Sequence, residues 1–177
     1  LKKNFLNEIT DVVHIAGGYD IEMSEVDSYM SNVVLTQNLL FLTTKMKKLS
    51  HFHLISSFSV IGKNKSVNVN FEHELGAVKN ITNYYSKGKM LQESICRNFV
   101  QSKGNFKLRI YRPGIVVETR PGMKVKKIDG PLYFLKFLKK YHQIARPLMF
   151  SFFPFSKGAC LPLISVHVLA RQVVEAV

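Results

Sequence analysis

The chain has 177 residues, a length that suits one domain with a hydrophobic core, and its 46% hydrophobic and 21% charged residues are typical of a folded protein rather than a disordered one. No apolar run approaches the roughly eighteen residues that a membrane-spanning helix needs, and the two cysteines, Cys96 and Cys160, lack the spacing of a metal site. With 25 Lys and Arg against 12 Asp and Glu, the net charge is +13, which can indicate nucleic acid, anionic lipid or a phosphorylated substrate as a partner. The basic residues are scattered and no nucleic-acid-binding motif occurs, so we expect a generally basic surface and no nucleic acid as a partner. The two lone thiols suggest a reducing compartment, so we expect a cytoplasmic location.

The first half of the chain alternates between strand-like and helix-like segments. Residues 11–16 form a short β-branched run that ends at Gly17-Gly18, which predicts a buried strand followed by a tight loop. Apolar residues recur with helical spacing over residues 23–48, and residues 51–57 form the next predicted strand. The polar residues 63–78 predict a surface loop.

The second half continues this alternation. A helix is predicted over residues 84–101, and an alternating strand over 106–111 ends at Arg112-Pro113-Gly114. We also expect a helix after Asp129-Gly130-Pro131, an irregular apolar segment over 146–162 and a closing helix over 166–177. The repeated order of strand and helix predicts an α/β fold, with a parallel sheet and crossover helices.

Residues suited to proton transfer occur at the start of the predicted helix 84–101. Tyr85 and Lys89 are four residues apart, so on a helix they share one face, where an ammonium beside the phenol favours phenolate and lowers the tyrosine pKa. Such a tyrosine can exchange a proton with a carbonyl or alcohol oxygen. Ser57 follows the preceding strand, at the edge of a parallel sheet where ligands bind. These residues also have ordinary structural explanations. Tyr85 and Lys89 could belong to a solvated helix face, and Ser57 could cap the end of a strand.

Five segments in order resemble the extended short-chain dehydrogenases/reductases, a family of sugar-nucleotide epimerases, hydroxysteroid dehydrogenases and acyl-thioester reductases. Residues 11–17 resemble the family pattern D-x-V-x-H-x-A-A, 32–40 resemble N-V-x-G-T-x-N-L-L, 56–62 resemble S-S-x-x-V-x-G, 83–93 resemble N-x-Y-x-x-S-K-x-x-x-E, and 108–117 resemble L-R-x-x-R-P-G-x-V. Towards the carboxyl end, residues 127–134 are similar to I-D-G-P-Y-Y-F of the acyl-reductase branch, and 163–170 to V-x-V-D-x-V-A.

The resemblance implies a Rossmann-type, three-layer α/β fold and hydride transfer between NAD or NADP and a carbonyl or alcohol carbon. Residues 1–117 would be the remainder of the NAD(P)-binding domain, and 118–177 the start of a substrate-binding region. Tyr85 would be the acid/base and Lys89 its partner and a ribose ligand, while Ser57 orients the substrate oxygen and Asn32 supports the lysine through water. The residues implied to lie against the cofactor are Ala16, Gly17, Tyr85, Lys89, Arg112, Pro113 and Gly114.

The chain also departs from the family pattern. The G-x-x-G-x-x-G turn that holds the pyrophosphate does not occur, so we expect an amino-terminal truncation and weak dinucleotide binding. Gly88 replaces the usual serine before Lys89, Leu35 replaces a glycine, and His167 stands where aspartate is usual. An alternative function is therefore a non-catalytic remnant that acts as a binding module.

Two further features have alternative interpretations. Residues 132–141 place Lys136, Lys139 and Lys140 on one side of a predicted helix and leucines on another, which suits either a peripheral membrane contact or ordinary packing on a core. The Phe-rich carboxyl region favours a lipid-like or acyl small-molecule substrate. His51 and His53 point to the same side of a strand, but with no third ligand nearby in the sequence we expect packing and no metal site.

Overall fold

A three-stranded parallel sheet organises the chain. The computed structural model describes residues 5–20, 22–61, 81, 83–118 and 162–177. Its strands are β1 (Asp11–His14), β2 (His51–Ile55) and β3 (Lys107–Tyr111), hydrogen-bonded in the order β1-β2-β3. Each connection crosses over through helix, which confirms the predicted Rossmann-type α/β fold.

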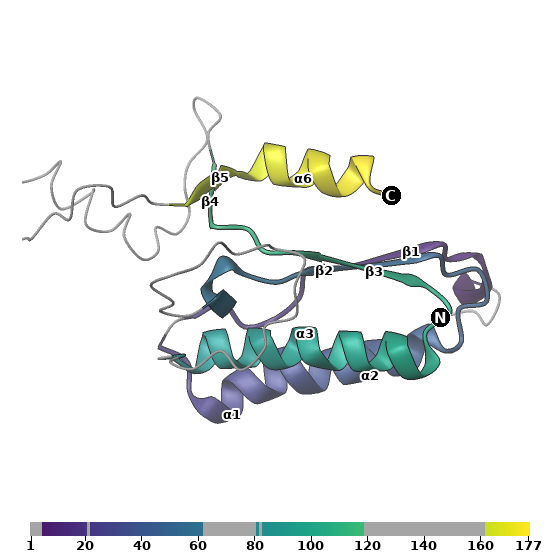
Figure 1. Cartoon of the computed structure of the whole chain (residues 1–177), viewed down its shortest axis with the longest axis horizontal. Coiled ribbons are helices and arrows are strands. Elements are labelled where there is room, and N and C mark those ends of the chain that lie inside the picture. Colours follow the sequence, from purple (N-terminus) through teal and green to yellow (C-terminus); the bar gives the residue numbers. More distant parts are fainter. Residues whose placement is uncertain (1–4, 21, 62–80, 82, 119–161) are drawn as a thin grey trace, which may run out of the picture.

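The two crossovers pack their helices on one face of the sheet (Figure 1). Between β1 and β2, one continuous helical segment is built from α1 (Glu25–Ser28), the wider turns of η2 (Tyr29–Val34) and α2 (Leu35–Thr43). Between β2 and β3 come the short 3₁₀ turn η3 (Phe58–Ile61) and the long helix α3 (Tyr84–Lys103). The α3 helix begins at Asn83, whose side chain accepts a hydrogen bond from the Ser86 N–H and so satisfies one of the first backbone donors of the helix.

Alternation along the strands gives the sheet two different faces. Phe52 and Leu54 point towards α2 and α3 and are completely buried. The core packed around them consists of Leu40, Met46, Leu49, Phe52, Leu54, Cys96 and Phe106. The Phe52 and Phe106 rings stack with their centroids 5.7 Å apart. This core fixes the ends of the strands, from which the site residues project.

A smaller parallel pair follows β3. Strand β4 (Ile115–Val117) pairs with β5 (Leu163–Ser165), and β5 leads directly into α6 (Val166–Glu175), which lies on the other side of the main sheet from α3 (Figure 1). The helix predicted over 166–177 is thereby confirmed, whereas β5 was not predicted. None of the described helices is long and apolar enough to cross a membrane.

Several predictions fall on residues that the structure does not describe. The loop over 63–78, the helix after Pro131 with its three lysines, and nearly all of the Phe-rich segment lie outside the described residues. A domain boundary near residue 118 stays a prediction. A short 3₁₀ turn, η1 (Phe5–Glu8), precedes β1.

Candidate active site

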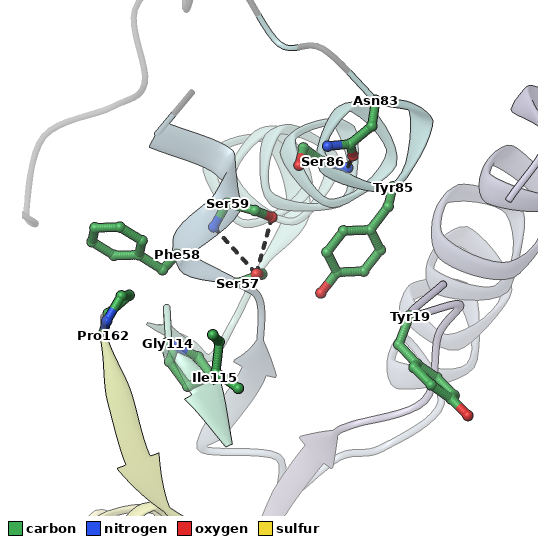
Figure 2. Close-up of a pocket in the computed structure, with 11 residues that line it drawn as sticks. Tyr19, Ser57, Phe58, Ser59, Asn83, Tyr85, Ser86, Gly114, Ile115 and Pro162 are labelled. Atoms are coloured by element: carbon green, nitrogen blue, oxygen red, sulfur yellow. Dashed lines mark hydrogen bonds between the residues drawn. The ribbon is translucent and has the colours of Figure 1, made fainter. Parts of the chain in front are cut away.

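A pocket of about 280 Å³ lies at the carboxyl ends of the strands, where open parallel sheets bind ligands. Ser57 reaches it from the end of β2, and Tyr85 from the first turn of α3. Figure 2 shows the Tyr85 ring extending from the helix into the space between Ser57 and Tyr19. The pocket is lined by Tyr19, Ser57, Phe58, Ser59, Asn83, Tyr85, Ser86, Pro113, Gly114, Ile115 and Pro162. The two hydroxyl residues predicted from the sequence are therefore brought together in one cavity.

The two adjacent serines after β2 have different surroundings. Ser56 is buried, and its hydroxyl donates to Glu93 Oε1 at 2.5 Å. The Ser57 hydroxyl lies at the pocket, where its oxygen accepts hydrogen bonds from the N–H of Ser59 at 3.2 Å and from its hydroxyl at 3.0 Å. Those two bonds occupy the lone pairs of Ser57 and leave its proton directed elsewhere, so Ser57 is the better placed of the two to donate to a pocket ligand.

Lys89 lies one turn of α3 beyond Tyr85 and is buried behind the pocket, with 5% of its surface exposed. Its ammonium donates to the Ile55 carbonyl oxygen at 3.4 Å and to Gln92 Oε1 at 3.1 Å. Burial lowers the pKa of Lys89 to about 8, a shift that the negative charge of Glu93 opposes. The ammonium is thus held at the end of β2. The influence of Lys89 on the Tyr85 phenol stays a prediction.

Asn32 and Lys89 converge on the backbone of Gly17, just past the end of β1. A Cβ atom at Gly17 would lie 2.6 Å from Asn32 Oδ1 and 3.1 Å from Lys89 Nζ, so a larger residue there would displace them. Asn32 is completely buried, and its amide nitrogen donates to the Ser28 carbonyl at 3.2 Å. Its Oδ1 atom accepts no hydrogen bond within the described part of the chain. This geometry is compatible with the predicted water between Asn32 and the lysine. The neighbouring Ala16 is exposed.

A buried polar network that was not predicted from the sequence fixes Lys89 from behind. Gln92 accepts from Lys89 through Oε1, while its Nε2 atom donates to Thr36 Oγ1 at 2.8 Å and lies 3.1 Å from His14 Nε2. Thr36 Oγ1 in turn lies 2.8 Å from the same His14 nitrogen and donates to the Asn32 carbonyl at 2.6 Å. Burial, assisted by the charge of Lys89, lowers the pKa of His14 to about 4, so this ring is neutral near pH 7. The sequence signal for Gln92 was its position three residues after Lys89, on the same helix face.

A buried ion pair ties the loop after β3 to α3. Arg112 donates from Nε to Glu93 Oε1 at 3.0 Å and from Nη2 to Glu93 Oε2 at 2.7 Å, and both side chains are almost fully buried. Pro113 and Gly114 line the pocket, whereas the Arg112 guanidinium is directed to α3. A Cβ atom at Gly114 would clash with the Pro162 carbonyl oxygen, so glycine permits the close approach of β4 and β5. The loop thus forms one wall of the pocket.

Comparison with known proteins agrees with this architecture. Residues 2–169 match the model of the NAD-binding family described as male sterility protein. No curated protein sequence matches significantly.

Solved structures share the fold at low sequence identity. The UDP-Glc/GlcNAc 4-epimerase from Campylobacter jejuni has a TM-score of 0.66 and 16% identity, over 97% of this chain and 54% of that one. The UDP-glucuronic acid 4-epimerase from Bacillus cereus, in complex with UDP-glucuronic acid and NAD, has a TM-score of 0.63 and 20% identity, over 98% of this chain and 51% of that one. The terminal R domain from the myxalamid PKS-NRPS pathway has a TM-score of 0.57 and 19% identity, over 66% of this chain and 29% of that one.

The chain spans about half or less of the length of these structures. The family match, in contrast, covers nearly all of its residues. The chain therefore belongs to the NAD-binding male sterility protein family.

Proposed function

We propose that the chain carries the catalytic half of an NAD(P)-dependent oxidoreductase that transfers a hydride to or from a carbonyl or alcohol carbon. One observation carries this proposal: the Ser57 and Tyr85 side chains, from two separate elements, line one pocket at the carboxyl ends of the strands. An acid/base and a hydroxyl donor at one cavity meet the geometric requirement for proton exchange with a substrate oxygen.

In this mechanism Tyr85 gives a proton to the substrate oxygen during reduction, or takes one during oxidation. Ser57 donates a hydrogen bond to the same oxygen and holds it beside the phenol. Lys89 places a positive charge behind the tyrosine, and Asn32 supports that ammonium through a bridging water. NAD or NADP, when bound, supplies or accepts the hydride.

The residues present suit the ribose and nicotinamide end of the cofactor. The ammonium of Lys89 and the amide oxygen of Asn32, which accepts no hydrogen bond from the described residues, both approach the backbone of Gly17, and these are groups that can hold ribose hydroxyls. Ala16, Pro113 and Gly114 would complete the contacts at the strand ends, while Arg112 would hold the loop in place through Glu93. The G-x-x-G-x-x-G turn does not occur among these 177 residues, so pyrophosphate contacts are not assigned to them.

The pocket favours a lipid-like or acyl substrate over a sugar nucleotide. Beside its hydroxyl groups, the walls are formed by Phe58, Pro113, Ile115 and Pro162, and no charged side chain lines the part of the pocket that the structure describes. Apolar walls with a few polar groups at one end suit an acyl chain that ends in a carbonyl. The epimerases with the same fold act on UDP-sugars by their names, so both substrate classes belong in the assay.

The decisive experiment compares the full natural gene product with its Tyr85→Phe variant. We expect the wild-type protein to oxidise NADH or NADPH with fatty aldehydes or acyl thioesters, and Tyr85→Phe to lose at least a hundredfold in kcat. Ser57→Ala should raise KM and lower kcat less severely. Equal turnover by Tyr85→Phe would contradict the assignment. Turnover with UDP-sugars alone would retain the enzyme class and exclude the acyl substrate.

The alternative of a non-catalytic binding module has its own test. One combination of results would favour a membrane-associated module: no turnover, together with binding to vesicles of anionic lipid. That binding should be unchanged by substitution of Tyr85 and lost on substitution of Lys136, Lys139 and Lys140.

A further inference from the structure

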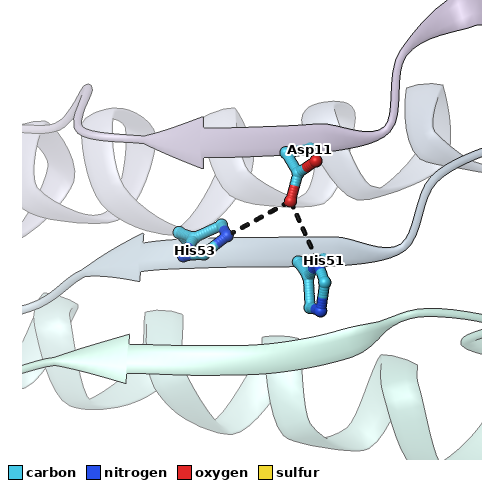
Figure 3. Close-up of side chains that lie close together, drawn as sticks. All are labelled: Asp11, His51 and His53. Atoms are coloured by element: carbon cyan, nitrogen blue, oxygen red, sulfur yellow. Dashed lines mark hydrogen bonds and ion pairs between the residues drawn. The ribbon is translucent and has the colours of Figure 1, made fainter. Parts of the chain in front are cut away.

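A second cluster of functional side chains lies far from the pocket, where the strands begin. Asp11 opens β1, and the parallel register places it opposite His51 of β2, with His53 two residues further on. Asp11 Oδ1 is 2.9 Å from His51 Nδ1 and 3.6 Å from His53 Nε2 (Figure 3). One ligand atom from each of the three residues lies within 4.8 Å of the other two. We propose that Asp11, His51 and His53 bind a divalent transition-metal ion of the zinc class.

His53 provides the strongest argument for a cation at this position. Its ring is completely buried, and Nε2 forms no hydrogen bond with the described residues although it lies beside the Asp11 carboxylate. The other ring nitrogen, Nδ1, is 3.0 Å from the Tyr111 hydroxyl. A second-shell oxygen of this kind orients the ring in metal-binding histidines. At 3.6 Å, the contact between His53 Nε2 and the Asp11 carboxylate is longer than a hydrogen bond, and a buried nitrogen without a hydrogen bond among the described residues is costly in free energy; a metal ion between the two groups would satisfy both.

The ligand set and spacing indicate which metal suits the site. Around a tetrahedral zinc ion with bonds of about 2.0–2.2 Å, ligand atoms lie roughly 3.3 Å apart. The two distances from Asp11 Oδ1 lie within about 0.4 Å of that value. The ligand atoms of the three residues lie within 4.8 Å of one another, so side-chain rotations of His51 and His53 would have to shorten the longest separation by up to about 1.5 Å to close the site. Two imidazoles and one carboxylate favour zinc, cobalt or nickel over magnesium or calcium. Three protein ligands leave a fourth position for water.

One charge on the same face opposes the binding of a cation. Arg109 of β3 is the register partner of His53 and acts electrostatically on its ring. We therefore expect weaker binding than in a site closed by four protein ligands, with the negative charge of Asp11 offsetting part of the repulsion. Asp11 and His51 keep 15% and 21% of their side-chain surface exposed, which gives an ion access from solvent.

The location of the cluster distinguishes its role from catalysis. It lies at the amino ends of β1 and β2, whereas the pocket lies at the carboxyl ends, about four residues or ~13 Å along the strands. A metal bound there would not contact Tyr85 or Ser57. It would instead cross-link the edge strand β1 to the central strand β2, and so stabilise the sheet independently of any turnover.

The test measures metal binding by the 177-residue chain after treatment with chelator. Calorimetric titration with Zn²⁺ and visible absorbance with Co²⁺ should each report one site that depends on the cluster, and Zn²⁺ should raise the melting temperature. The isosteric Asp11→Asn and the partly exposed His51→Gln should each weaken Zn²⁺ binding at least tenfold and abolish the thermal shift. His167→Gln is the matched control, because His167 lies on α6 beside Glu118 and away from the cluster. It should bind as the wild type does.

Two results would overturn the proposal. One is a wild-type chain that does not bind Zn²⁺ at concentrations up to about 1 mM. The other is unchanged binding in Asp11→Asn, since any site at the remaining histidines or cysteines would be unaffected by this substitution. Melting curves without metal establish that both variants fold. Because the readout is binding rather than turnover, this test is independent of the proposed oxidoreductase activity.

Discussion

The buried ion pair between Glu93 and Arg112 allows the arrangement of the pocket to be tested through stability. Their side chains keep only 3% and 5% of their surface exposed, and two parallel hydrogen bonds of 3.0 and 2.7 Å join them. Replacing Arg112 by Met keeps the aliphatic volume but leaves the Glu93 carboxylate buried, with Ser56 as a remaining donor. Breaking a buried pair in this way typically costs about 3 to 5 kcal/mol. For a chain of this size, that loss corresponds to a fall in Tm of about 6 to 20 °C.

Urea unfolding and thermal melts of the 177-residue chain measure this effect. The double variant Glu93→Gln/Arg112→Met should be more stable than Arg112→Met alone, because no uncompensated charge then stays buried while the amide still accepts from Ser56. Lys87→Met is a matched control: Lys87 pairs with Glu25 at 2.6 Å, but both side chains are at least half exposed. Its removal should leave the Tm unchanged.

The reasoning would be refuted by a small effect. If Arg112→Met lowered the free energy of unfolding by less than about 1 kcal/mol, the carboxylate of Glu93 would have to be solvated, and the loop after β3 could not be fixed as the structure shows. The double variant could instead be less stable than Arg112→Met by as much as Glu93→Gln alone lowers the free energy of unfolding of the wild type. That result would show that the two residues act independently.

Three further predictions concern the core and the buried polar groups. Phe52→Ala should lower the free energy of unfolding in urea by about 3 to 5 kcal/mol. Phe41→Ala, at a ring that is 66% exposed, should change it little, and equal losses in the two variants would contradict the assigned core. Gly17→Ala should destabilise the chain by about 1 to 3 kcal/mol, because its Cβ would lie 2.6 Å from a buried amide oxygen; an unchanged Tm would disprove this close approach. Burial lowers the pKa of Lys89 from 10.5 to about 8, so between these values the unfolded chain binds more protons and the free energy of unfolding should rise with pH. Lys89→Met should lose that rise, which unfolding curves at pH 8 and pH 10 would detect.

The order of elements and the pocket residues could be predicted because they depend on local patterns. A β-branched run, helical spacing and glycine or proline at the ends were enough to place β1, β2, β3 and α3 within a few residues. Ser57 follows from the same logic, since parallel strands direct their carboxyl ends to one edge of the sheet. Tyr85 was found by its spacing of four residues from Lys89 on a predicted helix and by the family resemblance. The long helix after β1 was predicted to start at Met23 and end at Lys48, but α2 ends at Thr43, where threonine side chains bond back to nearby carbonyls and the chain turns.

The contacts that depend on strand register could not be predicted. Period-two alternation placed His51 and His53 on one side of β2, but only the pairing of β1 with β2 brings Asp11 beside them. The expectation that no third ligand lies near the two histidines was therefore wrong. In the same way, Gln92 reaches His14 across 78 residues of sequence. Side-chain partners at such separations follow from tertiary packing and leave no periodic signal in the sequence.

The polar groups behind the pocket bear on the choice between an enzyme and a non-catalytic remnant. Lys89, Gln92 and Asn32 are almost completely buried, and the lowered pKa of the lysine shows that its charge is held there at a cost in stability. The fold itself does not require this arrangement, since apolar side chains of similar size would pack the same space without desolvating an ammonium. Buried ionisable groups whose pKa is shifted in this way are concentrated at functional sites. If the chain were only a packing module, Lys89→Met would change its stability, through the lost charge and the lost hydrogen bond to Gln92, and change nothing else. If the oxidoreductase proposal is correct, the same substitution would also weaken cofactor binding and turnover in the full gene product, a combination that a purely structural lysine would not produce.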